Sequence, residues 1–215
     1  HNIFIANEFF DALPIKQFFK INNKWMERFV ILDKNNNKRF VNIKSNINKI
    51  EKKLGFNISK NQKIIEYSPL GLKYLKKISK KINPKKGCLL IIDYGYLNSS
   101  MKNTLLAVRK HQNADVLSKI GNSDITHKLN FKIIKKITNN LKLKCQGITS
   151  QKNFLINLGI KERAEILSRN LPFSKKVDIY YRLKRLIDNS QMGDLFKVML
   201  ITNKKINFKT GFKHD

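Results

Sequence analysis

The chain has 215 residues, of which 41% are hydrophobic, so it can bury the core of one domain or of one domain with a small appendage. No stretch approaches the ~20 consecutive apolar residues that cross a bilayer, and we expect no membrane insertion. The formal net charge of +29 comes mainly from 37 lysines, with only 7 arginines. A surface that reads nucleic-acid sequence usually relies on arginine, so nucleic-acid binding is not our leading interpretation.

The N-terminal part predicts a buried strand followed by an antiparallel meander. A fully buried strand is expected over residues 2–6, because Ile3 to Ala6 form an uninterrupted apolar run. Residues 15–43 indicate three strands, whose turns fall at the asparagines of 22–23 and 35–37 because Asn tolerates a positive φ.

The next segment predicts a strand–helix–strand unit. A short strand is expected over 63–67, and Ser68 and Pro69 are favourable as the N-cap and the first residue of a helix. The helix should end at Asn83, because Pro84 follows it. The apolar run within 87–96 predicts a second strand, and this order of elements is typical of a layered α/β fold.

Residues 121–190 are expected to be mostly helical. Within 121–131, Asp124 or Thr126 is expected to cap a helix, and His127 has no catalytic partner at motif spacing. Segment 104–108 fits either a strand or a short helix. The expected helices are 130–141, 150–160, 161–170 and 174–189, and the expected strands are 142–148 and 194–203.

Cysteines and histidines indicate neither disulfides nor a metal site. Cys88 and Cys145 lie far apart in apolar runs, as expected for reduced thiols in a cytosol-like compartment. The four histidines, at positions 1, 111, 127 and 214, lack the spacing of metal ligands.

Acidic residues follow two of the expected strands. Glu8 and Asp11 come just after the first strand, and Asp93 ends the apolar part of the strand at 87–96. Open α/β sheets bind ligands at the carboxyl ends of their strands, where a carboxylate can hold a cation or act as a general base. Phe9 and Phe10 could wall such a cleft. Alternatively, these acids cap turns, and Asp11 in particular could cap the segment that follows it.

Seven blocks, in order, resemble the MidA family of S-adenosylmethionine-dependent methyltransferases. They are NEFFDALPIKQF, EYSP, LLIIDYGY, TLLAVRKH, SDITHKLNF, SQKNFLINLGIKER and MGDLFKVM. The resemblance implies an α/β fold, namely the C-terminal part of a class I (Rossmann-like) methyltransferase, with 15–43 as an inserted β-meander and with extra helices. Residues 1–215 would form one partial domain. By this resemblance, the N-terminal half with the glycine-rich cofactor loop lies outside these residues.

The resemblance further implies S-adenosylmethionine as the cofactor and a protein arginine as the methyl acceptor. The family includes a mitochondrial complex I assembly methyltransferase, so a complex I subunit is the expected protein partner. Glu8 and then Asp11 are the expected catalytic residues. The expected substrate-binding residues are Asn7, Phe9, Asp93, Tyr94 and Gln151.

The sequence departs from the family pattern at two positions near the expected site. Lys152 replaces a glycine after Gln151, and Asn130 stands where an acid is usual, so Asn130 is assigned no catalytic role. A non-catalytic assembly module for a respiratory subunit is the alternative function, and nucleic-acid binding is less favoured. The expected compartment is the cytoplasm of a bacterium with an AT-rich genome, or the mitochondrial matrix of a eukaryote. The sequence assigns no oligomeric state.

Overall fold

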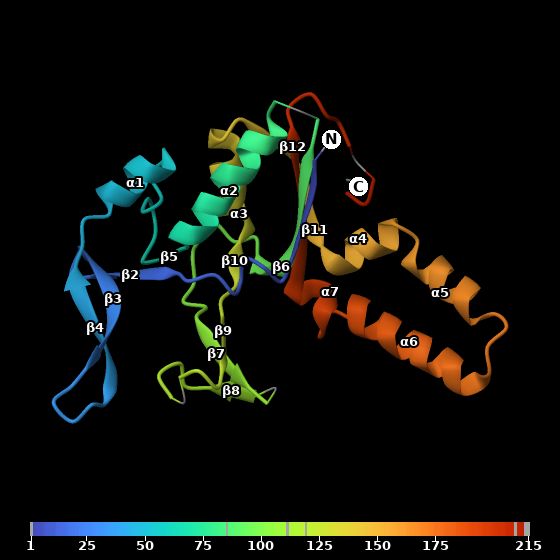
Figure 1. Cartoon of the computed structure of the whole chain (residues 1–215), viewed down its shortest axis with the longest axis horizontal. Coiled ribbons are helices and arrows are strands. Elements are labelled where there is room, and N and C mark those ends of the chain that lie inside the picture. The colour runs from blue at the N-terminus through green and yellow to red at the C-terminus, as the bar shows by residue number, and fades with distance from the viewer. Residues whose placement is uncertain (1, 85, 111, 119, 209, 213–215) are drawn as a thin grey trace.

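The computed structural model describes residues 2–84, 86–110, 112–118, 120–208 and 210–212, and its main sheet has the strand order β1-β6-β12-β11 (Figure 1). Strand β1 is parallel to β6, whereas β12 is antiparallel to both β6 and β11. The carboxyl ends of β1, β6 and β11 therefore meet at one edge of the sheet. The strands are β1 (Ile3–Asn7), β6 (Cys88–Tyr96), β11 (Leu143–Ser150) and β12 (Phe196–Asn203), and β10 (Leu129–Asn130) extends the sheet beside the end of β6.

Helices α2 (Pro69–Ile82) and α3 (Phe131–Asn140) cover one face of this sheet (Figure 1). The predicted start of α2 is confirmed, because the Ser68 side chain accepts a hydrogen bond from the Gly71 amide. Apolar side chains of both helices pack on those of β6 and β12 in the larger core. Its fully buried members include Ile82, Leu89, Ile91, Phe131, Met199 and Ile201.

The opposite face of the sheet is covered less completely. Ile3 and Ile5 are 72% and 69% exposed, so the prediction of a fully buried first strand is wrong for the described chain. The strand lies at the sheet edge, and these two side chains line an apolar groove of about 570 Å³ with Leu90, Phe154 and Phe212. An apolar run shows that a strand can be buried on both faces, but it does not show what covers them.

The predicted meander is confirmed as strands β2 (Lys16–Ile21), β3 (Lys24–Leu32) and β4 (Lys38–Lys44). Its turns have Asn22, Asn23 and Asn36 at positive φ. However, β5 (Ile64–Tyr67) pairs with β2 and not with β6, so the expected unit over 63–96 is wrong in its first strand. The strands that pair with β6 in parallel are instead β1 and the short β10. Helix α1 (Asn48–Leu54), which was not predicted, lies between β4 and β5.

A small third sheet has the order β8-β7-β9, with β7 (Leu106–Arg109), β8 (Gln112–Ala114) and β9 (Asp124–Thr126). Asp124 and Thr126 are therefore strand residues, and the prediction that either caps a helix is wrong. The cap of α3 is Asn130, whose side chain accepts a hydrogen bond from the Ile133 amide. A helix cap and a short polar strand both place small polar residues before an apolar run, so sequence alone does not distinguish them.

Helices α4 (Gln151–Asn157), α5 (Ile160–Ser168), α6 (Phe173–Ile187) and α7 (Met192–Leu195) follow β11, as the helical prediction for this region requires. Helices α5 and α6 form a hairpin that projects away from the sheet (Figure 1). Within the described ranges, no helix is both long and apolar enough to cross a membrane.

Candidate functional site

The loop that follows β1 presents Glu8 at the carboxyl edge of the main sheet. Glu8 has φ +47, in the left-handed region that residues other than glycine seldom adopt. Its amide donates to the Ile92 carbonyl at 3.0 Å, which ties the loop to β6. The side chains of Asn7 and Glu8 are exposed, and the Asn7 amide donates to Glu8 Oε1 at 3.5 Å. The backbone thus holds an unusual conformation that directs a carboxylate outward.

Asp93 holds this loop through hydrogen bonds from the loop's backbone amides. Its side chain is fully buried, and its Oδ2 accepts hydrogen bonds from the amides of Phe10 at 3.0 Å and Asp11 at 3.3 Å. Its Oδ1 accepts a further bond from the Tyr94 amide at 2.9 Å. Both oxygens of Asp93, which the sequence assigned to substrate binding, are therefore occupied by backbone donors.

Asp11 lies beside Asp93 and is 7% exposed. Its Oδ2 accepts a hydrogen bond from the Thr126 hydroxyl at 2.8 Å, whereas its Oδ1 is buried and has no hydrogen-bond partner among the described residues. Burial, together with the negative charge of Asp11, raises the pKa of Asp93 to about 7. The structure thus brings the carboxylates of Asp11 and Asp93 together in a buried position, while the Glu8 carboxylate is exposed.

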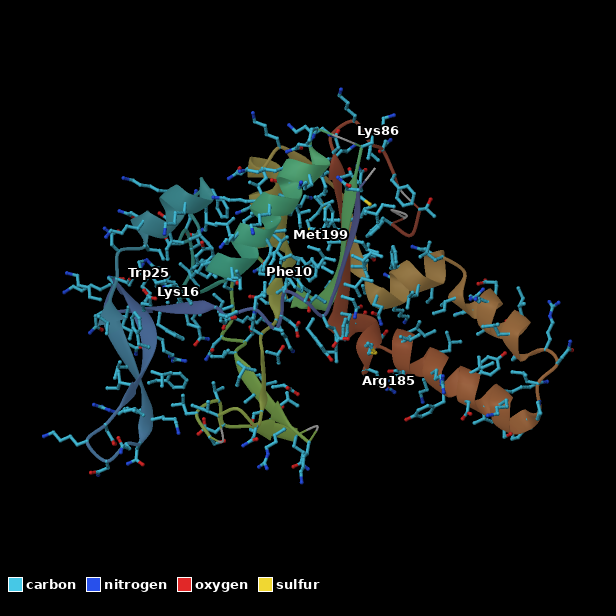
Figure 2. The ribbon with its side chains drawn as sticks, in the orientation of Figure 1. Phe10, Lys16, Trp25, Lys86, Arg185 and Met199 are labelled. Carbon is cyan, nitrogen blue, oxygen red and sulfur yellow. The ribbon has the colours of Figure 1, made fainter. Side chains whose placement is uncertain are left out.

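Tyr94 shares the electrostatic environment of these acids from the opposite face of β6. Its ring packs against Phe196 with the ring centres 4.1 Å apart. Burial and the charges of Glu8 and Asp11 raise the pKa of Tyr94, and the charge of Arg185 opposes this rise. Arg185 belongs to the part of α6 nearest the sheet (Figure 2). Tyr94 therefore lies within electrostatic reach of Glu8.

The two phenylalanines of the loop have different environments. Phe9 is 37% exposed and makes edge-on contacts with the rings of Phe10 and Tyr74, at centroid distances of 5.2 and 5.1 Å. Phe10 is buried on the side of the sheet that faces α2 (Figure 2). Only Phe9 can therefore contact a ligand at the surface beside Glu8.

Gln151 begins α4 at the same edge of the sheet, and its side chain is buried in a contact with α6. It is 5% exposed, and its Nε2 donates to the Leu186 carbonyl of α6 at 3.0 Å. The structure gives Gln151 the role of joining α4 to α6.

Thr126 and His127 are residues of the site that the sequence analysis missed. Besides the Thr126 bond to Asp11, the His127 amide donates to the Asp11 carbonyl at 3.1 Å, and His127 Nε2 lies 3.1 Å from the Phe10 carbonyl. These contacts join segments more than 110 residues apart, so no local spacing could have indicated them. The sequence signal for these two residues is a polar pair at the end of a short strand, and this pattern fits a turn equally well.

The site combines one exposed carboxylate, that of Glu8, with the two buried carboxylates of Asp11 and Asp93. Within the described ranges, no ion pair reaches Glu8, Asp11 or Asp93, and no group of three or more His, Cys, Asp or Glu is arranged to hold a metal ion. His1, His111 and His214 lie outside the described residues. An exposed carboxylate in this setting can hold an ammonium or guanidinium group or accept a proton.

The raised pKa of Asp93 predicts a pH-dependent stability. A carboxyl whose pKa rises from 3.8 in the unfolded chain to about 7 in the fold favours the fold fully below pH 4, and this contribution is lost as the pH rises through about 7. Asp11→Asn removes the neighbouring charge and still accepts from Thr126. Relative to this variant, the wild-type free energy of unfolding should therefore fall by about 1 kcal/mol between pH 4 and pH 8. Urea denaturation across this range measures the difference, and a difference that stays constant would contradict the coupling.

Comparisons with known proteins are consistent along most of the chain. Residues 1–149 match the family described as "Putative S-adenosyl-L-methionine-dependent methyltransferase". The mitochondrial protein arginine methyltransferase NDUFAF7 of Danio rerio is 28% identical over 202 residues, covering 94% of this chain and 47% of the relative. The Xenopus laevis protein of the same name is 31% identical over 200 residues, covering 92% and 45%. The chain thus spans about half the length of these curated relatives.

Two crystal structures from Burkholderia thailandensis share the fold. An uncharacterised protein superimposes with a TM-score of 0.82 at 21% identity, covering 99% of this chain and 58% of the other. A protein bound to S-adenosyl-homocysteine gives a TM-score of 0.81 at 21% identity, covering 99% and 56%. The fold expected from the sequence is therefore confirmed.

Proposed function

The chain belongs to this family of S-adenosyl-L-methionine-dependent methyltransferases, and from this membership we propose that its gene product methylates arginine side chains of a protein. The observation that carries the proposal is the Glu8 carboxylate, which is exposed at the carboxyl edge of the sheet on a loop held by Asp93. Two relatives are named protein arginine methyltransferases. Because the chain spans about half their length, activity, substrate and partner are proposals for the whole gene product.

The surface beside Glu8 fits the cofactor that the family name implies. S-adenosylmethionine carries a methyl group on a positively charged sulphur, which it supplies for transfer when bound. The exposed ring of Phe9, beside Glu8, is a group that attracts a cation such as this sulphonium. These 215 residues contain no G-x-G-x-x-G motif, so we propose that the main cofactor loop belongs to the half of the family fold that they do not span.

In this proposal Glu8 accepts hydrogen bonds from Nε and one terminal nitrogen of the substrate arginine. Such charge-assisted bonds would orient the other terminal nitrogen towards the methyl group that the cofactor supplies. On methylation that nitrogen would lose one proton to water, so the product would keep a single positive charge. Asp11 is the second candidate, and its Oδ1 has no hydrogen-bond partner among the described residues.

The other predicted residues support this arrangement in different ways. We propose that Asn7, Phe9 and Tyr94 line the path of the substrate, since Asn7 and Phe9 are exposed beside Glu8 and Tyr94 shares its electrostatic environment. Asp93 and Gln151 act through the loop and through α6, because their polar atoms already bind backbone groups.

The acceptor is proposed to be a subunit of respiratory complex I or a similar protein. The curated relatives are named mitochondrial, so we place the protein in the mitochondrial matrix of a eukaryotic host and in the cytoplasm of a bacterial one.

One observation favours a binding role beside catalysis. The α5–α6 hairpin exposes Phe173 at 82%, Tyr181 at 70% and Ile166 at 62%. Its surface therefore carries exposed apolar side chains interspersed with many lysines and arginines. A protein that only binds its partner would capture it equally with and without S-adenosylmethionine and would incorporate no methyl groups.

Methyl incorporation tests the proposal directly. We expect the gene product to transfer tritium from S-adenosyl-L-[methyl-³H]methionine to protein in a soluble extract of its host. An excess of S-adenosyl-homocysteine should suppress the transfer, because it is the product of the reaction and competes for the same site. Partner capture without any protein-bound label would reject the enzyme and favour the assembly module.

A further inference from the structure

We propose that Thr126 and His127 are positioning residues, which hold the loop of residues 8–11 in the conformation that presents Glu8 to the substrate. The inference rests on the proposed function for its catalytic consequence. Its structural part rests only on the contacts between this pair and the loop.

The loop is held by two separate segments of the chain. Asp93 of β6 accepts the amides of Phe10 and Asp11. Thr126 and His127 bind the backbone carbonyls of the same two residues and one carboxylate oxygen of Asp11. These contacts are the Thr126 hydroxyl to Asp11 Oδ2 at 2.8 Å, the His127 amide to the Asp11 carbonyl at 3.1 Å, and His127 Nε2 to the Phe10 carbonyl at 3.1 Å. The backbone donors and acceptors of residues 10 and 11 are therefore all bound, directly after the strained Glu8.

The contact of the His127 ring also defines its tautomer. A carbonyl oxygen can only accept, so the proton must lie on Nε2 of a neutral ring, which leaves Nδ1 as an acceptor. His127 is 8% exposed, and Nδ1 is buried without a hydrogen-bond partner among the described residues. Burial also lowers the pKa of His127, which keeps the ring neutral near pH 7.

The segment that carries the pair is itself anchored. The Lys128 amide donates to Thr104 Oγ1 at 2.9 Å, and this hydroxyl donates to Glu66 Oε2 at 2.5 Å. Strand β9 pairs with β7 in the small third sheet, and β10, which follows His127 closely in the chain, pairs with the end of β6. Thr126 and His127 are thus fixed by contacts on both sides of the pair, which is what a positioning contact requires if the loop is to be held within a fraction of an ångström.

Three variants of strand β9 test the proposal in the full gene product. Thr126→Val keeps the shape and removes the hydroxyl, Thr126→Ser restores it, and Ile125→Val is the control because Ile125 is exposed and pairs with Ala107 of β7. We expect Thr126→Val to speed hydrogen exchange at the Phe10 and Asp11 amides about tenfold. It should also lower kcat for arginine methylation about tenfold with KM within about twofold of wild type. Thr126→Ser should recover both.

The outcomes separate this inference from the proposed function. Unchanged kcat and unchanged amide exchange in Thr126→Val would overturn it, as would faster exchange with unchanged kcat. A wild-type protein without methyltransferase activity would reject the proposed function, and amide exchange alone would then decide whether Thr126 holds the loop. Imidazole ¹⁵N shifts of the wild type need no variant: protonation at Nε2 alone is expected for His127, and protonation at Nδ1 alone would overturn its contact with Phe10.

Discussion

Glu8→Gln is expected to lower the turnover of arginine methylation about 100-fold or more while changing the affinity for S-adenosylmethionine by no more than about twofold. The substitution keeps the size of the side chain and one hydrogen-bond acceptor. It removes the charge that holds the guanidinium and replaces the second acceptor by a donor that would face the guanidinium donors. Steady-state kinetics with a methylatable peptide, together with calorimetry for the cofactor, measure the two effects separately.

Two further variants complete this experiment. Glu162→Gln makes the same chemical change on an exposed residue in the first turn of α5 and should leave turnover unchanged. Glu8→Asp keeps the charge but withdraws it by one methylene, so its turnover should lie between those of wild type and Glu8→Gln. Turnover of Glu8→Gln equal to that of wild type would remove Glu8 from the mechanism.

Asp93→Ala is expected to lower the free energy of unfolding by about 3 kcal/mol. The substitution leaves the amides of Phe10, Asp11 and Tyr94 without their acceptor at a fully buried position, and it leaves a cavity beneath the loop. The raised pKa of Asp93 shows that its burial also has a cost, and this cost limits the expected loss at neutral pH. Urea denaturation at pH 6 measures the change.

The comparison for this prediction is Asp178→Ala on the exposed surface of α6, which should change the free energy of unfolding by less than about 0.5 kcal/mol. A loss below about 1 kcal/mol for Asp93→Ala would show that water replaces the carboxylate as the acceptor for these amides.

Elements with a local physical cause were predictable from the sequence. Helix α2 begins where Ser68 and Pro69 place it, and the turns of the meander fall at asparagines that adopt positive φ. Strand β6 follows from its apolar run and ends at Tyr96, as predicted, where β10 pairs with it. In each case the determinant lies within a few residues of the element.

Features that depend on distant partners were not predictable in this way. The pairing of β5 with β2 depends on which strands meet in space. The same limit applies to the site. Glu8 and Asp93 could be selected as acids at strand ends, but the Phe10 and Asp11 amides that bind Asp93 Oδ2, and the bond from Thr126 to Asp11, come from contacts across more than 80 residues.

The chemical identity of the methylated side chain tests the proposed arginine site most directly. After incubation of the gene product with labelled S-adenosylmethionine and its host extract, labelled proteins can be digested and the modified residue assigned by tandem mass spectrometry. A carboxylate that holds a guanidinium predicts label on the terminal nitrogens of arginine. Label found only on lysine amines or on carboxyl groups, or no label on protein at all, would contradict it.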